Sequence, residues 1–378
     1  MRTFRCDNCG HALFFENVQC LQCGSVLAFL PDRLSLSAIE SVPSSSPIGL
    51  WRRKRPEHGF PEQQLYRHCQ NRTAQRSCNF DVAADDPNGL CVSCRQTRVL
   101  PDLSYPVNIQ RWCGIEAAKR RLFYTLAKLG LVCSDHVDGI AHGPAFEFLA
   151  DLPGLDVVTG HFEGVITLNV AEADDEERVR RRVALREPYR TLLGHLRHES
   201  GHFYWDRLIR DGGQTQAYRQ VFGNESADYE AALTAHYGSG GSPANWQAKH
   251  VSAYATAHPW EDWAETWAHY LHMVDLLETA ASYSTRLSVL GSDNAAADAV
   301  DDPFDNRAGG FDRLVAQWVP VTLLLNSLNR SLGQDDAYPF ALTAGALNKL
   351  RYVHDVIQAA APARDAGTSW RTDSRTDS

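Results

Sequence analysis

The segment "LLGHLRHESGHFYWD", residues 192–206, gives the first clue to what this chain is. It contains the pattern His-Glu-x-x-His at His198, Glu199 and His202. On a helix, positions i and i+4 share one face, so both imidazoles can bind the same Zn²⁺. Glu199 would then lie beside an open coordination position, where a carboxylate can accept a proton from zinc-bound water. The segment therefore predicts a catalytic zinc helix.

A helix from Glu187-Pro188 to about Arg210 would hold this pattern, because proline suits the first helical position. The metzincin pattern requires Gly-x-x-His after the second histidine, but the sequence continues "FYWDRLIR", which excludes that class. His195 lies one turn before His198, and we interpret it as a packing or supporting residue. A third zinc ligand must therefore come from elsewhere.

The best source of a third ligand is "SAYATAHPWEDWAETWAHYLH", residues 252–272. Glu261 and Glu265 are four residues apart on one face of a predicted helix. One carboxylate can bind zinc while the other hydrogen-bonds a histidine ligand and fixes its tautomer. The alternative is an acidic first helical turn, which the helix dipole favours. Both interpretations can hold together.

The N-terminal region predicts two further zinc sites, which would be structural. Two Cys-x-x-Cys pairs separated by ten residues are typical of a zinc ribbon, whose small core needs the metal to fold. A second group of four cysteines has one irregular half, with eight intervening residues, and His68 is an alternative ligand there. The first group comprises Cys6, Cys9, Cys20 and Cys23, and the second comprises Cys69, Cys78, Cys91 and Cys94.

The net charge of −9 is unevenly distributed. Residues 1–100 contain 12 basic and 9 acidic side chains, whereas the remainder contains 25 and 37. An acidic main body argues against a nucleic-acid partner, which needs basic surface. The chain has no apolar run of membrane-spanning or signal-peptide length, so we expect no membrane association and a cytoplasmic location.

The segment "GVITLNVAEAD", residues 164–174, alternates between apolar and polar residues and predicts a half-buried strand. We expect it to be an edge strand that pairs with extended substrate through Val165, Thr167 and Asn169, with an ordinary edge of the core sheet as the alternative.

Taken together, the zinc-ribbon cysteines, "GVITLNVAEAD", "EPYRTLLGHLRHESGHFYWDRL", "HPWEDWAETWAHYLH" and "LNSLNRSLG" resemble bacterial zinc-binding metallopeptidases with an N-terminal zinc ribbon. "HESGH" followed by "EDWAE" is similar to the gluzincins. This resemblance implies that Glu261 is the zinc ligand and Glu265 its supporting acid. The spacing of lethal-factor-like members implies that Tyr254 stabilises the oxyanion.

The expected fold is α+β, a mainly helical zincin-type domain with a small sheet that includes an edge strand. We expect a zinc ribbon over 1–28, a linker over 29–60, a second Cys₄ module over 61–105, the gluzincin-like peptidase domain over 106–360 and a disordered tail over 361–378.

The predicted function is a zinc peptidase with one catalytic and two structural zinc ions, acting on a peptide or protein substrate. The zinc ribbon would be available to a protein partner. Two alternatives remain open: a non-catalytic zinc-binding module, and a crosslink-repair protease resembling the SprT type.

Overall fold

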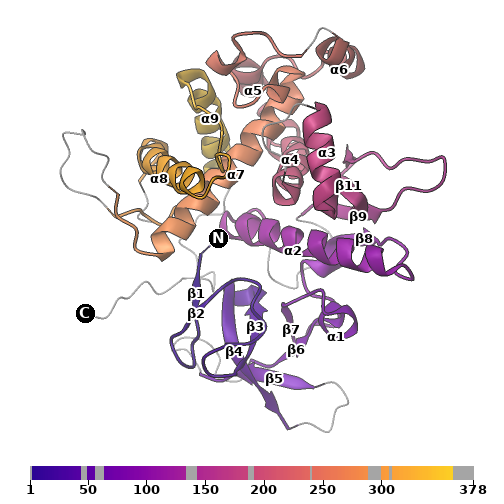
Figure 1. The fold of residues 1–378 in the computed structure, drawn as a ribbon, viewed down its shortest axis with the longest axis vertical. Coiled ribbons are helices and arrows are strands. Elements are labelled where there is room, and N and C mark those ends of the chain that lie inside the picture. Colours follow the sequence, from indigo (N-terminus) through magenta and orange to yellow (C-terminus); the bar gives the residue numbers. More distant parts are fainter. Residues whose placement is uncertain are drawn as a thin grey trace.

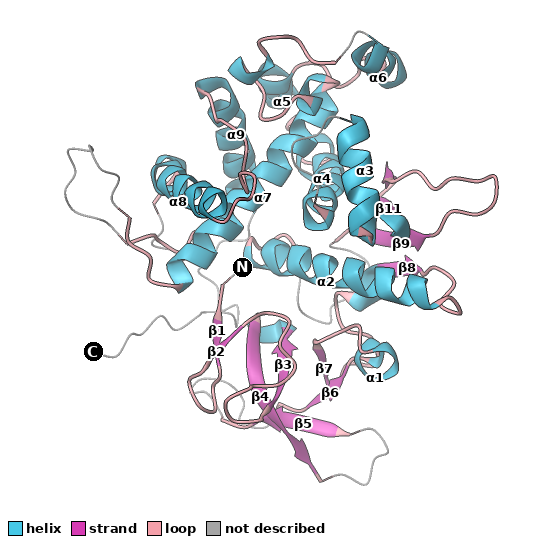
Figure 2. Cartoon of the chain, in the orientation of Figure 1, coloured by secondary structure: helices cyan, strands magenta, loops and turns pink. Residues whose placement is uncertain are grey.

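The computed structural model describes residues 2–43, 49–55, 64–132, 143–185, 191–238, 241–287, 299–305 and 309–360. Helix α2 (Pro106–Lys128) runs between an N-terminal part built mostly of strands and a C-terminal part built mostly of helices (Figure 1). Figure 2 shows the remaining strands beside α2, next to the helical part. The predicted α+β class is therefore confirmed. No helix within the described ranges is both long and apolar enough to cross a membrane.

The N-terminal part contains a small hairpin and a five-stranded antiparallel sheet. Phe29 donates its backbone N–H to the Asn79 carbonyl at 2.9 Å, which brings the first strand of the sheet beside the last. The hairpin is formed by β1 (Phe4–Arg5) and β2 (Ala12–Leu13). The sheet has the order β3 (Val26–Leu30), β4 (Ser35–Val42), β5 (Leu50–Arg53), β6 (Tyr66–His68) and β7 (Asp81–Ala83).

The linker predicted over 29–60 is wrong for most of its described residues. Strands β4 and β5 lie inside it and pair with each other, while β4 also pairs with β3 and β5 with β6. Leu36, Ala38 and Ile39 on β4 are buried. The two predicted cysteine modules therefore share one sheet. The Ser/Pro-rich residues 44–48 lie outside the described residues, as does the predicted tail over 361–378.

The N-terminal part packs directly against α2 and α7 (Pro259–Ser282). Phe15 makes an edge-to-face contact with Tyr124 of α2, with ring centroids 5.6 Å apart. The Arg2 backbone N–H donates to Glu278 at 2.9 Å, and that of Thr3 donates to Ser282 at 3.1 Å. The N-terminal part is therefore fixed to the far end of α7.

A second sheet has the order β10 (Gly160–Phe162), β11 (Val165–Asn169), β9 (Ala145–Leu149) and β8 (Thr97–Val99). The predicted strand is confirmed as β11, but its edge position is wrong. Val165 and Thr167 pair with β10 on one side and with β9 on the other, so the β11 backbone is already bonded there. Asn169 is buried, and its amide donates to Asp151 at 2.7 Å. The edge strand next to α4 is β10.

Helix α4 (Leu192–Trp205) packs against α7, and α8 and α9 cover other sides of α7. Gly201 makes the close approach of α4 and α7 possible, because a Cβ atom there would lie 2.9 Å from the Ala264 Cα. The other α-helices are α1 (Gln70–Gln75), α3 (Asp175–Leu185), α5 (Thr215–Phe222), α6 (Tyr229–Gly238), α8 (Phe311–Ser331) and α9 (Ala344–Ala360).

Candidate active site

Helix α4 carries the His-Glu-x-x-His pattern, and its N-terminal end is capped. The side chain of Thr191 caps the helix by accepting a hydrogen bond from the Gly194 N–H at 2.9 Å. His198, Glu199 and His202 then lie on the buried part of the helix. Their side chains face the N-terminal end of α7, so the predicted pattern is placed where a second helix can complete it.

Helix α7 starts at Pro259, and His258 caps it by accepting from the Trp260 N–H at 3.1 Å. Glu261 therefore lies in the first turn, and Glu265 follows one turn later. Because positions i and i+4 share a helix face, both carboxylates point toward α4. Glu261 is only 1% exposed.

His198, His202 and Glu261 converge, and their candidate ligand atoms all lie within 4.8 Å of one another. The Nε2 atom of His198 is 3.0 Å from Oε2 of Glu261, and Nε2 of His202 is 3.5 Å from Oε1. Two imidazoles and one carboxylate are the ligand set of one known class of catalytic zinc sites. The sequence-predicted trio is thus brought together by two helices.

Glu265 contacts the nitrogen of the His198 ring that does not face Glu261. Its Oε1 lies 2.7 Å from Nδ1 of His198, and its Oε2 accepts from the Ser252 hydroxyl at 2.5 Å. A proton on Nδ1 leaves Nε2 with its lone pair directed toward Glu261, which is the tautomer a metal ligand needs. This is the supporting geometry expected for Glu265.

The electrostatics of Glu261 suit a bound cation. Burial alone would raise the pKa of this carboxyl group, but charge and hydrogen bonding from His202 and His198 outweigh it and hold the pKa well below its usual range. A buried carboxylate requires positive charge nearby. A zinc ion among the same three side chains would supply that charge, so the residues present fit the metal.

Glu199 is buried beside this trio, with two different environments for its two oxygens. Its Oε1 lies 3.2 Å from Nε2 of His195. Its Oε2 has no hydrogen-bond partner among the described residues. Burial alone would raise the pKa of Glu199, but the hydrogen bond from His195 and the charges of the three histidines outweigh it and lower the pKa. Glu199 is therefore ionised at neutral pH.

Two tyrosines approach the same site. The ring centroid of Tyr254 is 5.9 Å from that of His198. Tyr229 on α6 donates from its hydroxyl to Oε1 of Glu261 at 2.7 Å. Burial and the nearby Glu261 carboxylate raise the pKa of both phenols well above the ordinary value, so both stay protonated donors.

Trp260 and His161 lie beside His202. The ring centroid of Trp260 is 3.8 Å from that of His202, and the ring centroid of His161 on β10 is 6.3 Å from it. Burial, assisted by the charge of His202, lowers the pKa of His161 to about 4. The edge strand thus reaches the candidate site through an uncharged imidazole.

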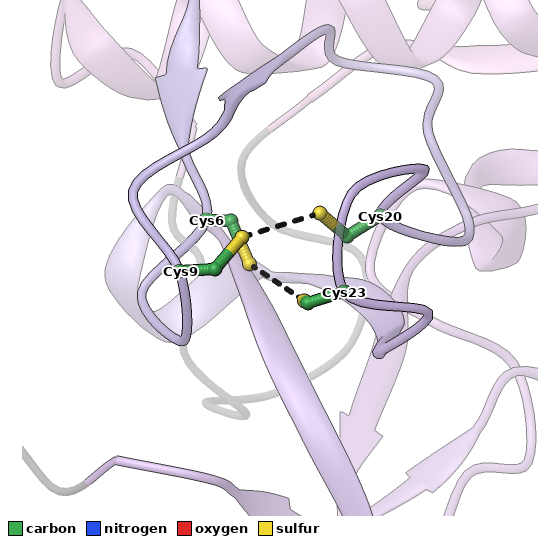
Figure 3. Close-up of side chains that lie close together, drawn as sticks. All are labelled: Cys6, Cys9, Cys20 and Cys23. Carbon is green, nitrogen blue, oxygen red and sulfur yellow. Dashed lines mark hydrogen bonds between the residues drawn. The ribbon is translucent and has the colours of Figure 1, made fainter.

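The first cysteine group is formed by two facing loops, with Cys6 and Cys9 between β1 and β2 and Cys20 and Cys23 between β2 and β3 (Figure 3). Cys6 and Cys23 have Sγ atoms 3.8 Å apart, and those of Cys9 and Cys20 are 3.7 Å apart. Four sulfurs bound tetrahedrally at about 2.3 Å from zinc would lie about 3.8 Å from one another. A disulfide would need only about 2 Å. The spacing therefore fits a zinc ion.

The second cysteine group is fully buried, and its sulfurs accept backbone N–H groups. The Cys91 N–H donates to Sγ of Cys69 at 3.3 Å, and the Sγ atoms of Cys78 and Cys91 are 3.7 Å apart. Cys94 completes this set of four. His68 instead hydrogen-bonds Asp81 at 2.8 Å, so it does not replace a cysteine.

Several residues of the site were not predicted from the sequence. Tyr229, Ser252 and His161 contact ligands or the supporting acid, yet none belongs to a recognisable spacing pattern. The partner of His195 was also missed: its Nδ1 lies 2.6 Å from the Glu172 carboxylate. Glu172 follows β11 in the chain, and only the fold brings it to α4.

Comparisons with known sequences independently indicate a zinc-binding protein. The family described as "Putative zinc-binding metallo-peptidase" matches residues 108–356. A zinc-ribbon domain family matches residues 3–105, which includes both cysteine groups.

Two relatives match over nearly the whole length. One from Mycobacterium tuberculosis (strain H37Rv) and one from Mycobacterium bovis are each 40% identical over 373 residues, covering 98% of this chain and 100% of the relative. Both are described as uncharacterized proteins. No solved structure matches the chain.

Proposed function

This chain belongs to the zinc-binding metallo-peptidase family, and from that premise we propose that it hydrolyses peptide bonds at the site formed by α4 and α7. The observation that carries the proposal is the convergence of His198, His202 and Glu261 beside a buried Glu199 oxygen that has no hydrogen-bond partner in the described part of the chain. These three would hold one zinc ion, as in the gluzincins. The two cysteine groups would hold two structural zinc ions.

A zinc ion held by His198, His202 and Glu261 would supply Lewis-acid chemistry, lowering the pKa of a water molecule to near 7 and polarising the substrate carbonyl. Glu199 accepts the proton of the attacking water at Oε2 and later donates it to the leaving amine. Tyr254 donates its hydroxyl proton in a hydrogen bond to the carbonyl oxygen as negative charge develops there. Tyr229 and Glu265 keep the ligands in place.

The cysteine groups supply a contrast that supports catalysis at the histidine site. Each of them offers four thiolates, which fill a tetrahedral metal and leave no position for water. The histidine site offers three ligands and a base. A purely structural site has no need of Glu199. A peptidase at this site would act on a peptide or protein substrate, and binding of a protein partner to the zinc ribbon stays a prediction.

Zinc content and cleavage, measured together on the full chain, test the proposal. The variants are Glu199→Gln, Glu261→Ala and, as a matched control, the exposed Glu230→Gln on α6. Wild type and Glu230→Gln should hold three zinc ions and cleave members of a peptide and denatured-protein panel. Glu261→Ala should hold two. Glu199→Gln should hold three and lose activity by about 10²–10⁴-fold.

Retained cleavage by Glu199→Gln would refute the proposed base. Full zinc content in Glu261→Ala would place the third ligand elsewhere. A wild-type protein that binds zinc but cleaves nothing would favour a non-catalytic zinc-binding module. Salt-dependent binding of single-stranded DNA by that protein would favour the crosslink-repair alternative.

A further inference from the structure

His195 lies between two carboxylates and can donate to both. Its Nε2 is 3.2 Å from Oε1 of Glu199, and its Nδ1 is 2.6 Å from Oε2 of Glu172. Ionised carboxylates only accept hydrogen bonds. The imidazole therefore connects Glu199 to Glu172, and this contact involves none of the three candidate zinc ligands.

Glu172 is itself held in one position. It is 1% exposed and lies in the short 3₁₀ turn Val170–Ala173 that follows β11. Its Oε1 accepts from the Thr159 hydroxyl at 2.7 Å, and the oxygen of that hydroxyl accepts from the Asn169 N–H at 3.1 Å. Both Glu172 oxygens are therefore hydrogen-bonded, one to Thr159 and one to His195.

The direction of these contacts decides the position of the Glu199 carboxylate. A buried Glu side chain with three rotatable bonds can aim its oxygens in several directions. The bond from His195 fixes Oε1, which leaves Oε2 as the oxygen with no partner among the described residues. A rigid donor behind a general base keeps it within the narrow geometry that proton transfer needs.

We propose that Thr159, Glu172 and His195 form a positioning relay that aims Oε2 of Glu199 at the attacking water. This inference rests on the proposed function, because it assigns Glu199 the part of the base. Each member of the relay is a positioning residue that acts through the next. Because Thr159 directly precedes β10, the relay also joins the edge strand of the sheet to the base.

The variants remove one link at a time. His195→Phe breaks both bonds of the imidazole, and His195→Gln restores one N–H donor. Thr159→Val removes the hydroxyl at nearly constant volume, and Thr159→Ser restores it. Thr125→Val is the matched control, because Thr125 of α2 also donates to a buried carboxylate, that of Asp275 on α7, at 2.7 Å.

Steady-state kinetics and zinc content measure the effect on full-length protein. His195→Phe should lower kcat about 10- to 100-fold, with KM changed less than about two-fold and all zinc retained. His195→Gln and Thr159→Ser should recover part or all of the loss, and Thr125→Val should leave kcat unchanged. In the His195→Phe background, Thr159→Val should cause no further loss, since the relay is already broken.

Crystal structures of zinc-loaded wild type and His195→Phe give a readout that needs no activity. The Glu199 carboxylate should keep Oε1 on His195 in wild type and take another orientation in the variant. An unchanged orientation, or an unchanged kcat in a folded, zinc-loaded His195→Phe, would overturn the relay. If wild type cleaves nothing, the proposed function fails, and the crystal comparison alone still decides whether His195 positions Glu199.

Discussion

The buried cysteine group and the histidine site are two candidate metal sites of one fold, and the groups that surround them differ. Around Cys69 and Cys91, backbone N–H groups point at the sulfurs, and all four thiols are buried in the core. Around His198, side chains from α4, α6 and α7 meet, and one buried carboxylate oxygen of Glu199 has no partner within the described ranges. We expect the first arrangement to stabilise the fold. Under the proposed function, the second would hold reactive groups in place and contribute less to stability.

The largest expected difference between the two sites is their effect on folding. Cys78→Ser should remove zinc from the buried cysteine group and lower the free energy of unfolding by roughly 5 kcal/mol or more, because structural zinc binding is coupled to folding. Glu261→Ala should remove zinc from the histidine site and leave the melting temperature within a few degrees of wild type. Thermal unfolding followed by circular dichroism, together with zinc content, measures both.

Cys113→Ser is the control for that comparison, since Cys113 belongs to neither cysteine group. Equal melting temperatures for Cys78→Ser and wild type would show that the two kinds of site do not differ in this way.

Acid should destabilise the helical part through His269, which is buried on α7 and shares a hydrogen bond with the Tyr338 hydroxyl. Burial lowers the pKa of His269 to about 4, against about 6.5 when unfolded. The unfolded chain therefore binds a proton first, and stability present above pH 6.5 is lost as the pH falls toward 4, by up to roughly 3 kcal/mol.

Urea unfolding of His269→Gln between pH 4 and 7 tests this contribution. The variant should show a shallower pH dependence than wild type, whereas substitution of the exposed His11 by Gln should not. Parallel curves for His269→Gln and wild type would contradict the assignment.

Gly201→Ala should affect stability and metal binding together, because it acts where α4 meets α7. The added methyl would lie 2.9 Å from the Ala264 Cα and 3.2 Å from the Trp267 ring, so the helices must separate. Overpacking of this kind costs about 1–3 kcal/mol, and the histidines would move away from Glu261. Urea unfolding and a zinc chelator titration measure the two effects.

Gly238→Ala is the matched control, since a methyl there meets no atom within 4 Å. A Gly201→Ala protein that loses stability but keeps full zinc affinity would show that the spacing of α4 and α7 does not govern the histidine site.

The smallest expected effect concerns the hydrogen bond from Tyr229 to Glu261. Tyr229→Phe should weaken zinc binding at the histidine site about ten-fold, which corresponds to the lower end of the roughly 1.5–3 kcal/mol contributed by a hydrogen bond to a charged group. Competition with a fluorescent zinc chelator measures the affinity. The exposed Tyr283→Phe should bind as wild type. Equal affinities for all three proteins would mean that Tyr229 does not support the ligand.

The sequence predicts the local parts of these sites well. Cys-x-x-Cys spacing and His-Glu-x-x-His spacing depend on one turn of chain, so both groups appear where expected. Glu261 lies 59 positions after His202, and resemblance was needed to choose it over Glu265. Tyr229 and Glu172 come from other elements. No spacing rule links them to α4, so the sequence did not reveal them.

The two errors in the predicted fold have a common physical origin. Alternation in "GVITLNV" predicts a strand but not its neighbours, and β10 was missed because it is only three residues long. The Ser/Pro-rich composition around 41–49 favoured a linker. The apolar residues Leu36, Ala38 and Ile39 of β4, which are buried, were therefore not assigned to a strand. Strand order depends on long-range pairing that composition does not encode.

The length of helix α7 is constrained because both of its ends make specific contacts. Glu261 lies near its first residue, and Glu278 near its last turn receives the Arg2 N–H of the N-terminal part. One inserted residue between them would rotate one end against the other by about 100° and advance it by about 1.5 Å. Either the metal ligand or the anchor would then face the wrong way. An insertion or deletion within the intervening turns would therefore disrupt one of the two ends.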